Sequence, residues 1–327
     1  MEARDRLAAK TSAVCIADWQ LDEQWEGGLL ASSTQVGPER LEAAAACPRC
    51  RTPLACDAAS VRSQSCARVY PFSELGIPIL LAGDPPTLEE TWYPGALGVL
   101  PPGLRRFARR HRRLLIPELT YRSPNRRELV AKFVASLPAT ATIANVGGGT
   151  RRYGPNVVNI DVEPLAGVDL VGVAEQLPLL DGSCDGAVLQ AVLQHVRNAE
   201  LTLSELHRVL RPGAPLFIEV PFMQGYHPSP GDYRRYTEQG LRAELADHGF
   251  DVEDSGVAVG PASAMAWVAA EFLAFLVSGR SERVYRLVRP VSRWLTQPIK
   301  YADRWLDTHP MAHTIPSGVW ARGRRGE

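Results

Sequence analysis

Short apolar segments with strand character alternate with helical segments from residue 141 onward, and this alternation most constrains the fold. The expected strands read TIANV, VVNID, GVDLV, DGAVLQ and APLFIEV, and the expected helices read AELTLSELHRVL and TEQGLRAELADHGF. Strands separated by helices need a parallel sheet whose two faces are both covered. The sequence therefore predicts an α/β fold with a mostly parallel sheet.

Three glycines, Gly147, Gly148 and Gly149, follow the first expected strand in the segment NVGGGTRRYG. Such glycines let the backbone come close to a ligand. A dinucleotide-binding loop reads G-x-G-x-x-G and opens a full helix, but Arg152 stands at the third glycine position here. A crossover needs roughly ten to twelve residues including its helix, and the next strand follows so soon that we expect a helix of only a turn or two. A nicotinamide-dependent oxidoreductase is therefore the weaker interpretation.

The motifs that follow this loop occur in the order found in one enzyme family. They read NVGGGT, NIDVEP with an acid at the end of a strand, AEQLPLLDGSCDGAVLQAVLQHV and ELHRVLRPGAPLFIEVPF. From about residue 140 to residue 250, and more loosely to the C-terminus, the chain resembles the class I S-adenosylmethionine (SAM)-dependent methyltransferases. The resemblance implies a Rossmann-like, doubly wound, mostly parallel sheet, SAM as the cofactor and methyl transfer as the activity.

SAM carries an ammonium, a carboxylate, a ribose diol and a sulfonium, and the resemblance assigns residues to these groups. The glycines would admit the amino-acid part and the sulfonium, and Asp161 would accept both ribose hydroxyls. Two positions depart from the family, because Asn145 stands where an acid is usual and Val173 where an aspartate that contacts adenine is common. We expect Arg151 or Arg152 to bind the SAM carboxylate or an anionic substrate, with two solvated charges as the alternative. The expected cofactor-binding residues are Asn145, Gly147, Gly148, Gly149, Arg151, Asp161, Val162, Ala174, Glu175 and Gln190.

The methyl acceptor is expected beyond the carboxyl ends of the strands, where ligands of open α/β sheets bind. The segment PFMQGYHPSPGDYRRYTEQGL at 221–241 is dense in histidine, tyrosine and arginine, and its GDYRRYT run resembles the edge of the family's acceptor pocket. His227 is the first candidate for a general base, followed by Asp232 and His195, and Tyr233 is the fourth candidate catalytic residue. His195 could equally be a packing residue at the start of a helix. Thr237 has the character of a helix N-cap.

Four of the six cysteines, Cys47, Cys50, Cys56 and Cys66, fall within twenty residues. The segments CPRC, YP and GIPILL resemble a small zinc-ribbon module that is often fused ahead of such methyltransferases. That module has a second C-x-x-C pair, but Ser63 stands where the partner of Cys66 is expected. We expect either a structural zinc held by the four cysteines, with Cys56 as the displaced fourth ligand, or a relic ribbon held by apolar contacts alone.

Basic residues are clustered although the formal net charge is zero. LRRFARRHRR carries six arginines at 105–113, and five further arginines recur at helical spacing from Arg280 to Arg293, beside the apolar run 262–277. A basic stripe beside an apolar helix suits an anionic membrane surface or a lipid-linked acceptor, and a lid helix with its apolar face on the sheet is the alternative. We expect no nucleic acid as partner, because no recognisable RNA-binding module is present. The N-terminus has no apolar signal region, so we expect a cytoplasmic protein, with peripheral contact to the inner face of the membrane left open.

The sequence predicts four segments and one principal activity. The parts are a partly disordered N-terminal arm at 1–46, a zinc-ribbon-like module at 47–84, a linker with basic helices at 85–140, and a SAM-dependent methyltransferase domain at 141–327 with a helical insertion at about 262–307. We expect methyl transfer to a small-molecule or carbohydrate- or lipid-linked acceptor, by O-methylation. A catalytically silent scaffold with the same fold is the alternative.

Overall fold

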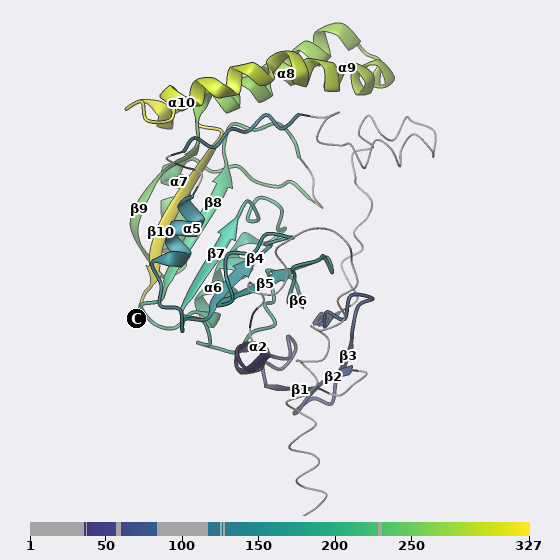
Figure 1. The fold of residues 1–327 in the computed structure, drawn as a ribbon, viewed down its shortest axis with the longest axis vertical. Helices are drawn as coiled ribbons and strands as arrows, with labels where there is room; N and C mark the ends of the chain where they lie inside the picture. Colours follow the sequence, from purple (N-terminus) through teal and green to yellow (C-terminus); the bar gives the residue numbers. More distant parts are fainter. Residues whose placement is uncertain are drawn as a thin grey trace, which may run out of the picture.

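The computed structural model describes residues 36, 38–56, 60–83, 117–124, 126, 128–227 and 231–327. Its centre is a seven-stranded sheet with the strand order β6-β5-β4-β7-β8-β10-β9 (Figure 1). The strands from β4 to β8 are parallel, and β10 runs antiparallel to both β8 and β9. The strands are β4 Ile143–Val146, β5 Val157–Asp161, β6 Leu170–Val171, β7 Gly186–Gln190, β8 Pro215–Pro221, β9 Phe250–Val259 and β10 Gly318–Arg325. The expectation of a doubly wound, mostly parallel sheet is confirmed.

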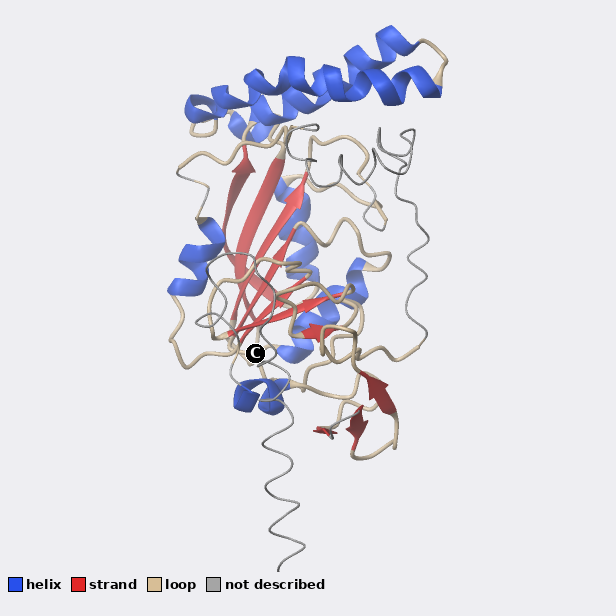
Figure 2. Ribbon diagram, turned by 45° about the vertical axis from the view of Figure 1, so that its right-hand side comes forward, coloured by secondary structure: helices blue, strands red, loops and turns tan. Residues whose placement is uncertain are grey.

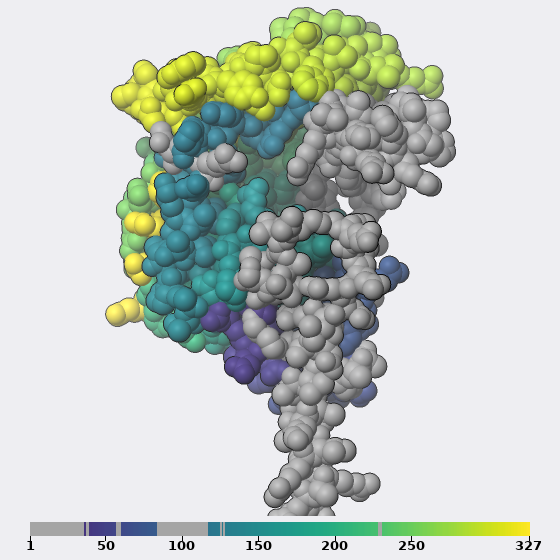
Figure 3. All heavy atoms as spheres, in the orientation of Figure 1, coloured from purple at the N-terminus to yellow at the C-terminus, as the bar shows by residue number. Residues whose placement is uncertain are grey.

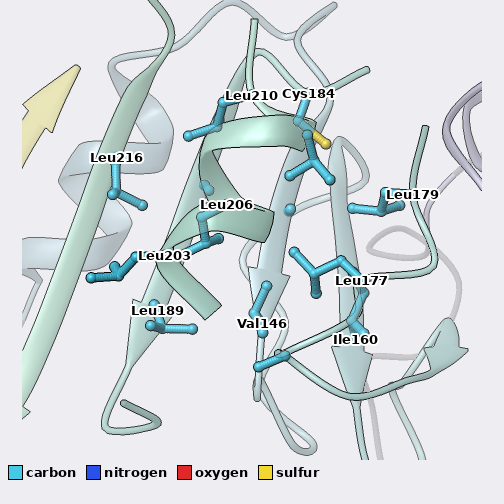
Figure 4. Close-up of a cluster of buried hydrophobic side chains, with 14 of the residues drawn as sticks. Val146, Ile160, Leu177, Leu179, Cys184, Leu189, Leu203, Leu206, Leu210 and Leu216 are labelled. Carbon is cyan, nitrogen blue, oxygen red and sulfur yellow. The ribbon is translucent and has the colours of Figure 1, made fainter. Parts of the chain in front are cut away.

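Helices cover both faces of this sheet (Figure 2). On one face, α6 (Ala199–Val209) inserts Leu203 and Leu206 among buried residues of the parallel strands, such as Leu189 (Figure 4). α7 (Glu238–Asp247) joins the same cluster through Leu241 and begins at its expected N-cap, where Thr237 Oγ1 accepts a hydrogen bond from the Gly240 N–H at 3.0 Å. On the other face, α5 (Leu129–Ala135) packs against a second cluster of strand residues. Apolar stripes at helical spacing therefore bury both faces, as the sequence pattern predicts.

The crossover from β4 to β5 contains no helix, contrary to the turn or two expected there. Residues 147–156 form turns and irregular backbone. The position of Gly147 within this loop is set by its N–H, which donates to the Ile160 carbonyl at 2.7 Å. The third strand is also shorter than the expected GVDLV run, since β6 holds only Leu170 and Val171.

A small antiparallel sheet of three strands lies beside the edge strand β6. It consists of β1 (Leu54–Cys56), β2 (Ser60–Ser63) and β3 (Val69–Pro71), and α2 (Pro38–Ala44) precedes it. The chain after β3 pairs with β6, because the Leu80 N–H donates to the Val171 carbonyl at 2.8 Å. Its buried residues belong to the same apolar cluster as those of the large sheet, so this N-terminal module and the sheet domain share one core.

A group of helices between β9 and β10 covers the end of the sheet at which the parallel strands finish (Figure 1). In the space-filling view these helices form a layer of atoms across the top of the molecule (Figure 3). We call residues 261–315 the cap; its elements are α8 (Pro261–Ser278), α9 (Glu282–Thr296), η2 (Gln297–Ala302), α10 (Asp303–Leu306) and η3 (Ala312–Thr314). Asp303 is fully buried and accepts hydrogen bonds from the N–H groups of Ala262 and Ser263 at 2.7 and 2.8 Å, which ties α10 to the first turn of α8.

Residues 117–123 run beneath the cap. The Tyr121 N–H donates to Ser263 Oγ at 2.9 Å, and Leu119 is fully buried against α8. The predicted arm at 1–46 and the basic segment at 105–113 lie mostly or wholly outside the described residues, and the division into domains stays a prediction.

Candidate active site

A cavity of about 1210 Å³ opens at the carboxyl ends of β4, β5, β7 and β8. Its walls come from the glycine loop, the segments that follow β5 and β7, the loop after β8, residues 117–122 and two side chains of the cap, Trp267 and Arg293. The strand order reverses between β4 and β7, and such switch points are where open α/β sheets bind their ligands.

The cofactor side of the cavity is built by the glycine loop and the end of β5. Gly147 has φ 67° and Gly149 has φ 54°, a backbone region that other residues rarely adopt. The Gly149 N–H donates to Asp161 Oδ2 at 2.8 Å, and the Glu163 N–H donates to Asp161 Oδ1 at 3.1 Å. Each carboxylate oxygen keeps further lone pairs for a second donor, so Asp161 can accept a ribose diol. Val162, Ala174 and Glu175 line the same cavity.

Five of the expected cofactor residues line a second cavity of about 310 Å³ beside the glycine loop. Gly147 lines both cavities, and the other four are Asn145, Gly148, Arg151 and Gln190. The Asn145 side chain is buried, and its Nδ2 donates to Asn159 Oδ1 at 2.8 Å. Gly148 is required beside it, because a Cβ there would lie 2.3 Å from Asn145 Nδ2. The Asn145 side chain therefore supports the glycine loop from inside the protein. The resemblance implies that an acid at this position would instead contact the SAM ammonium.

The two neighbouring arginines have different surroundings. Arg152 pairs with Asp169 at 3.0 and 3.3 Å and also donates to the Gly167 carbonyl. Both side chains of this pair are mostly buried, with 13% and 5% of their surface exposed. Arg151 instead donates to Gln190 Oε1 at 2.7 Å. Arg152 therefore anchors the helix-free crossover to the chain ahead of β6, and Arg151 is the arginine that faces a cavity.

A polar network that the sequence reasoning missed joins the ends of β7 and β8. Arg122 forms two hydrogen bonds with the buried Glu219, and Gln190 Nε2 donates to Glu219 Oε2 at 2.9 Å. Tyr153 OH in turn donates to Gln190 Oε1 at 2.9 Å. Burial lowers the pKa of Arg122, but the Glu219 carboxylate outweighs this and leaves that pKa raised. Glu219 could have been found as the single charge in the apolar strand PLFIEVP; no local signal marks Arg122.

The acceptor side of the cavity carries the two candidate histidines. The ring centres of His195 and His227 lie 6.1 Å apart, and the Trp267 ring lies 6.1 Å from His227. Burial, followed by the neighbouring His195, lowers the pKa of His227 below 6.5. His195 Nδ1 lies 2.5 Å from the Gly231 carbonyl oxygen, which only accepts, so Nδ1 donates and Nε2 remains for another partner.

Asp232 and Tyr233 take different positions in the same loop. Asp232 accepts from the His227 N–H at 2.7 Å and from both terminal nitrogens of Arg235. Burial raises its pKa, but the Arg235 guanidinium and the His227 N–H outweigh burial and lower it overall. Asp232 therefore holds the loop that carries His227 and is a poor proton acceptor. Tyr233 lines the cavity with a side chain that is 56% exposed.

The cysteines of the N-terminal module form a cluster of three. The thiols of Cys47, Cys50 and Cys66 lie within 4.8 Å of one another, and Ser63 Oγ lies 3.1 Å from Cys50 Sγ. Hydrogen bonds from Ser63, and then from Thr52, lower the pKa of Cys50 to about 6. Three thiolates with a hydroxyl or water as the fourth ligand fit a tetrahedral zinc ion.

Cys56 is not brought into this cluster. It lies on β1 opposite Val61, whereas Leu54 is the residue opposite Ser63. The register of the β1–β2 pair thus places Ser63, and not Cys56, beside the three thiols.

Comparison with known proteins finds methyltransferases. Residues 150–218 match the family model of a methyltransferase domain. The chain is 28% identical over 137 residues to the tRNA (carboxymethyluridine(34)-5-O)-methyltransferase ALKBH8 of Mus musculus, which is 37% of this chain and 20% of that protein. The chain therefore spans about a fifth of the length of this curated relative.

Two solved structures with similar folds are also methyltransferases by name. The 1,6-didemethyltoxoflavin-N1-methyltransferase of Burkholderia thailandensis is 15% identical, with a TM-score of 0.40 over 69% of this chain and 86% of that chain. Phosphoethanolamine N-methyltransferase 2 of Haemonchus contortus is 14% identical, with a TM-score of 0.40 over 62% of this chain and 52% of that chain. Residues 150–218 are thus similar to a methyltransferase domain, and they lie in a doubly wound sheet with a glycine loop after β4, as the resemblance to class I SAM-dependent methyltransferases predicts.

Proposed function

We propose that this methyltransferase moves the methyl group of SAM to a hydroxyl oxygen of a small-molecule or carbohydrate- or lipid-linked acceptor, with His227 as the proton acceptor. The observation that carries the proposal is one continuous cavity with Gly147 and Asp161 on one side and His195 and His227 on the other. A cofactor held by the first pair and an acceptor held against the second would meet inside it.

The wall on the acceptor side suits a polar molecule with an extended surface. Trp267, Tyr226 and Tyr233 offer aromatic faces, and Arg293 lies 5.0 Å above the Trp267 ring. The hydroxyl groups of Tyr226 and Tyr233 add polar atoms to these aromatic faces.

His227 is suited to accept the proton of such a hydroxyl. Burial and the neighbouring His195 lower its pKa, which favours the neutral imidazole, and a neutral ring nitrogen is an acceptor. SAM supplies an activated methyl group, and the enzyme's part is to hold the acceptor oxygen in line with it and to take the proton as the new C–O bond forms. The names of the relatives divide between oxygen and nitrogen acceptors, so the choice of oxygen rests on this histidine.

The test is turnover with SAM against candidate hydroxyl acceptors, followed by mass spectrometry for the gain of one methyl group. We expect His227→Asn to lower kcat by about 10²- to 10⁴-fold with the SAM Kd unchanged. The wild-type rate should fall as the pH drops below about 6.5, because the protonated ring cannot accept a proton. His313→Asn, at an exposed position in η3, is the matched control.

Full turnover by His227→Asn, or a pH profile that is the same in both proteins, would show that another group takes the proton. Calorimetric titrations separate the wider alternatives. SAM binding without any methylated product supports the silent scaffold, and NADH binding supports the oxidoreductase.

We also propose that Cys47, Cys50 and Cys66 hold a structural zinc ion with Ser63 or water in the fourth position. The closeness of the three thiols supports this. The protonated alternative would leave three thiols packed around the Ser63 and Thr52 hydroxyls with weak hydrogen bonds only.

A further inference from the structure

The cap carries most of the large hydrophobic side chains that are exposed in the described residues. Of 23 large hydrophobic side chains that are exposed in the described residues, 17 lie in the cap. Exposed apolar side chains are normal when they are scattered, but a contiguous group marks an interaction surface. Phe272 and Leu276 on α8 and Leu287, Val291 and Leu295 on α9 are spaced four residues apart, so each helix presents an apolar stripe to the outside.

Helix α9 has the opposite orientation to an ordinary surface helix, because its polar side faces the protein and its apolar side faces outward. Its inward side is polar: Arg289 pairs with Glu271 of α8 at 2.8 Å, and Arg293 Nε donates to the Pro117 carbonyl at 3.3 Å. Its outward side is apolar, with Leu287 and Leu295 56% and 68% exposed. Surface helices normally bury the apolar face, and the expected lid with its apolar face on the sheet is therefore not what α9 forms.

The charges of the cap select among possible occupants of this surface. The cap contains four acids, all within described residues. Asp303 and Asp307 are buried, Glu271 is paired with Arg289, and Glu282 alone is exposed. Three cations of the cap are exposed: Arg280 and Arg283 at the turn between α8 and α9, and Arg304 on α10. An apolar face bordered by cations complements the headgroups and acyl boundary of an anionic bilayer.

We propose that the cap docks this protein on an anionic lipid surface, with α8 and α9 lying in the plane of the interface. By length and composition α8 could cross a membrane, with 18 residues, a mean hydropathy of 1.5 and 39% of them buried in the fold. Its partner α9 could not, because arginines recur along it, and Glu271 in the middle of α8 pairs with one of them. An in-plane arrangement leaves those ion pairs intact and buries the outward stripes.

Docking in this way has a consequence for the acceptor, which rests on the proposed function. Trp267 of α8 and Arg293 of α9 reach inward from the cap into the wall of the active-site cavity. A cap on the membrane therefore places the acceptor side of the cavity one layer of helices away from the lipid surface, and a lipid-linked acceptor is the substrate class that this placement serves.

The test is co-sedimentation of the full chain with phosphatidylglycerol–phosphatidylcholine vesicles and with phosphatidylcholine vesicles. Binding should require phosphatidylglycerol and weaken with salt. Leu287→Ser should weaken it at least about fivefold, and Arg280→Gln with Arg283→Gln should weaken it about fivefold for each charge. Leu75→Ser, at an equally exposed position of the N-terminal module (57%), should leave it unchanged.

SAM affinity, measured on every variant, reports folding independently of docking, so a failure of catalysis and a failure of docking are distinguishable. Equal binding to both vesicle types, or equal losses in Leu287→Ser and Leu75→Ser, would overturn the proposal. A third outcome would also overturn the proposal: no vesicle binding, together with a dimer that Leu287→Ser converts to a monomer. The cap would then contact a second copy of the chain.

Discussion

Replacing Arg152 by methionine is the sharpest test of how the glycine loop is held without a helix. The substitution keeps an apolar stem of similar length and removes the guanidinium that pairs with Asp169 at 3.0 and 3.3 Å. Removing one partner of a buried ion pair costs about 3–5 kcal/mol, because the other charge remains uncompensated. Asp169 keeps the hydrogen bond from the Asn159 N–H at 2.8 Å, so we expect a loss near the lower end of that range.

The loss should depend on pH in a defined direction. Burial raises the pKa of Asp169, and Arg152 opposes the rise. An acid whose pKa is higher in the folded state stabilises the fold below its unfolded pKa, and this contribution is lost as the pH rises through the folded pKa. Without Arg152 the folded pKa rises further, so the deficit of the variant relative to the wild type should be largest at neutral pH and should shrink as the pH falls toward about 4.

Urea unfolding followed by circular dichroism measures these free energies. The double variant Arg152→Met with Asp169→Asn leaves no unpaired charge, and we expect it to be about 2 kcal/mol more stable than Arg152→Met alone. Arg151→Met is the matched control and should change stability by less than about 0.5 kcal/mol. A loss below about 1 kcal/mol in Arg152→Met, or strictly additive effects in the double variant, would refute the reasoning, because the pair would then behave as an exposed one.

Three further predictions concern the cofactor and the metal. Gly147→Ala places a methyl group 2.2 Å from Val192 Cγ2 at a residue with φ 67°, so the unfolding free energy should drop by about 1–3 kcal/mol and calorimetry should show weaker SAM binding. Asp161→Asn should weaken SAM binding about 10- to 100-fold, the worth of hydrogen bonds to a charged acceptor, and an unchanged Kd would contradict its expected role. Elemental analysis should find one zinc per chain that Cys66→Ser loses and Cys56→Ser keeps; retention by Cys66→Ser would contradict the three-thiol site.

The strands and helices of the sheet domain could be predicted because their signals are local. VVNID and DGAVLQ are apolar on both faces, and Thr237 lies directly before a helical run. Each of these features depends on residues a few positions apart, so periodicity and capping rules reach them. The run GVDLV predicts a longer strand than β6, which holds only Leu170 and Val171. Val171 also pairs with residues 78–80 of the N-terminal module, and no local pattern reveals this contact.

Only part of the candidate site could be predicted, because only some of its residues carry a local signal. The histidines and Asp161 stand at strand ends that the alternation locates, and the structure gathers them in one cavity. Arg122 meets Glu219 from 97 positions away, and a hairpin register decided that Ser63 rather than Cys56 lies beside the thiols. Such partners are brought together only when the whole chain has folded.

The sequence alone determined the class of fold, the position of the glycine loop and the resemblance to methyltransferases, because alternating apolar runs and an ordered set of motifs are properties of the chain itself. Tertiary structure alone decided the separate tasks of Arg151 and Arg152, and it decided which side of α9 faces the protein. Both arginines are identical by local criteria, and an amphipathic helix can be buried by either face. The choice depends on partners that are distant in the sequence: Asp169 pairs with Arg152, and Glu271 pairs with Arg289 of α9. Each pair becomes favourable only when the packed fold excludes water around it.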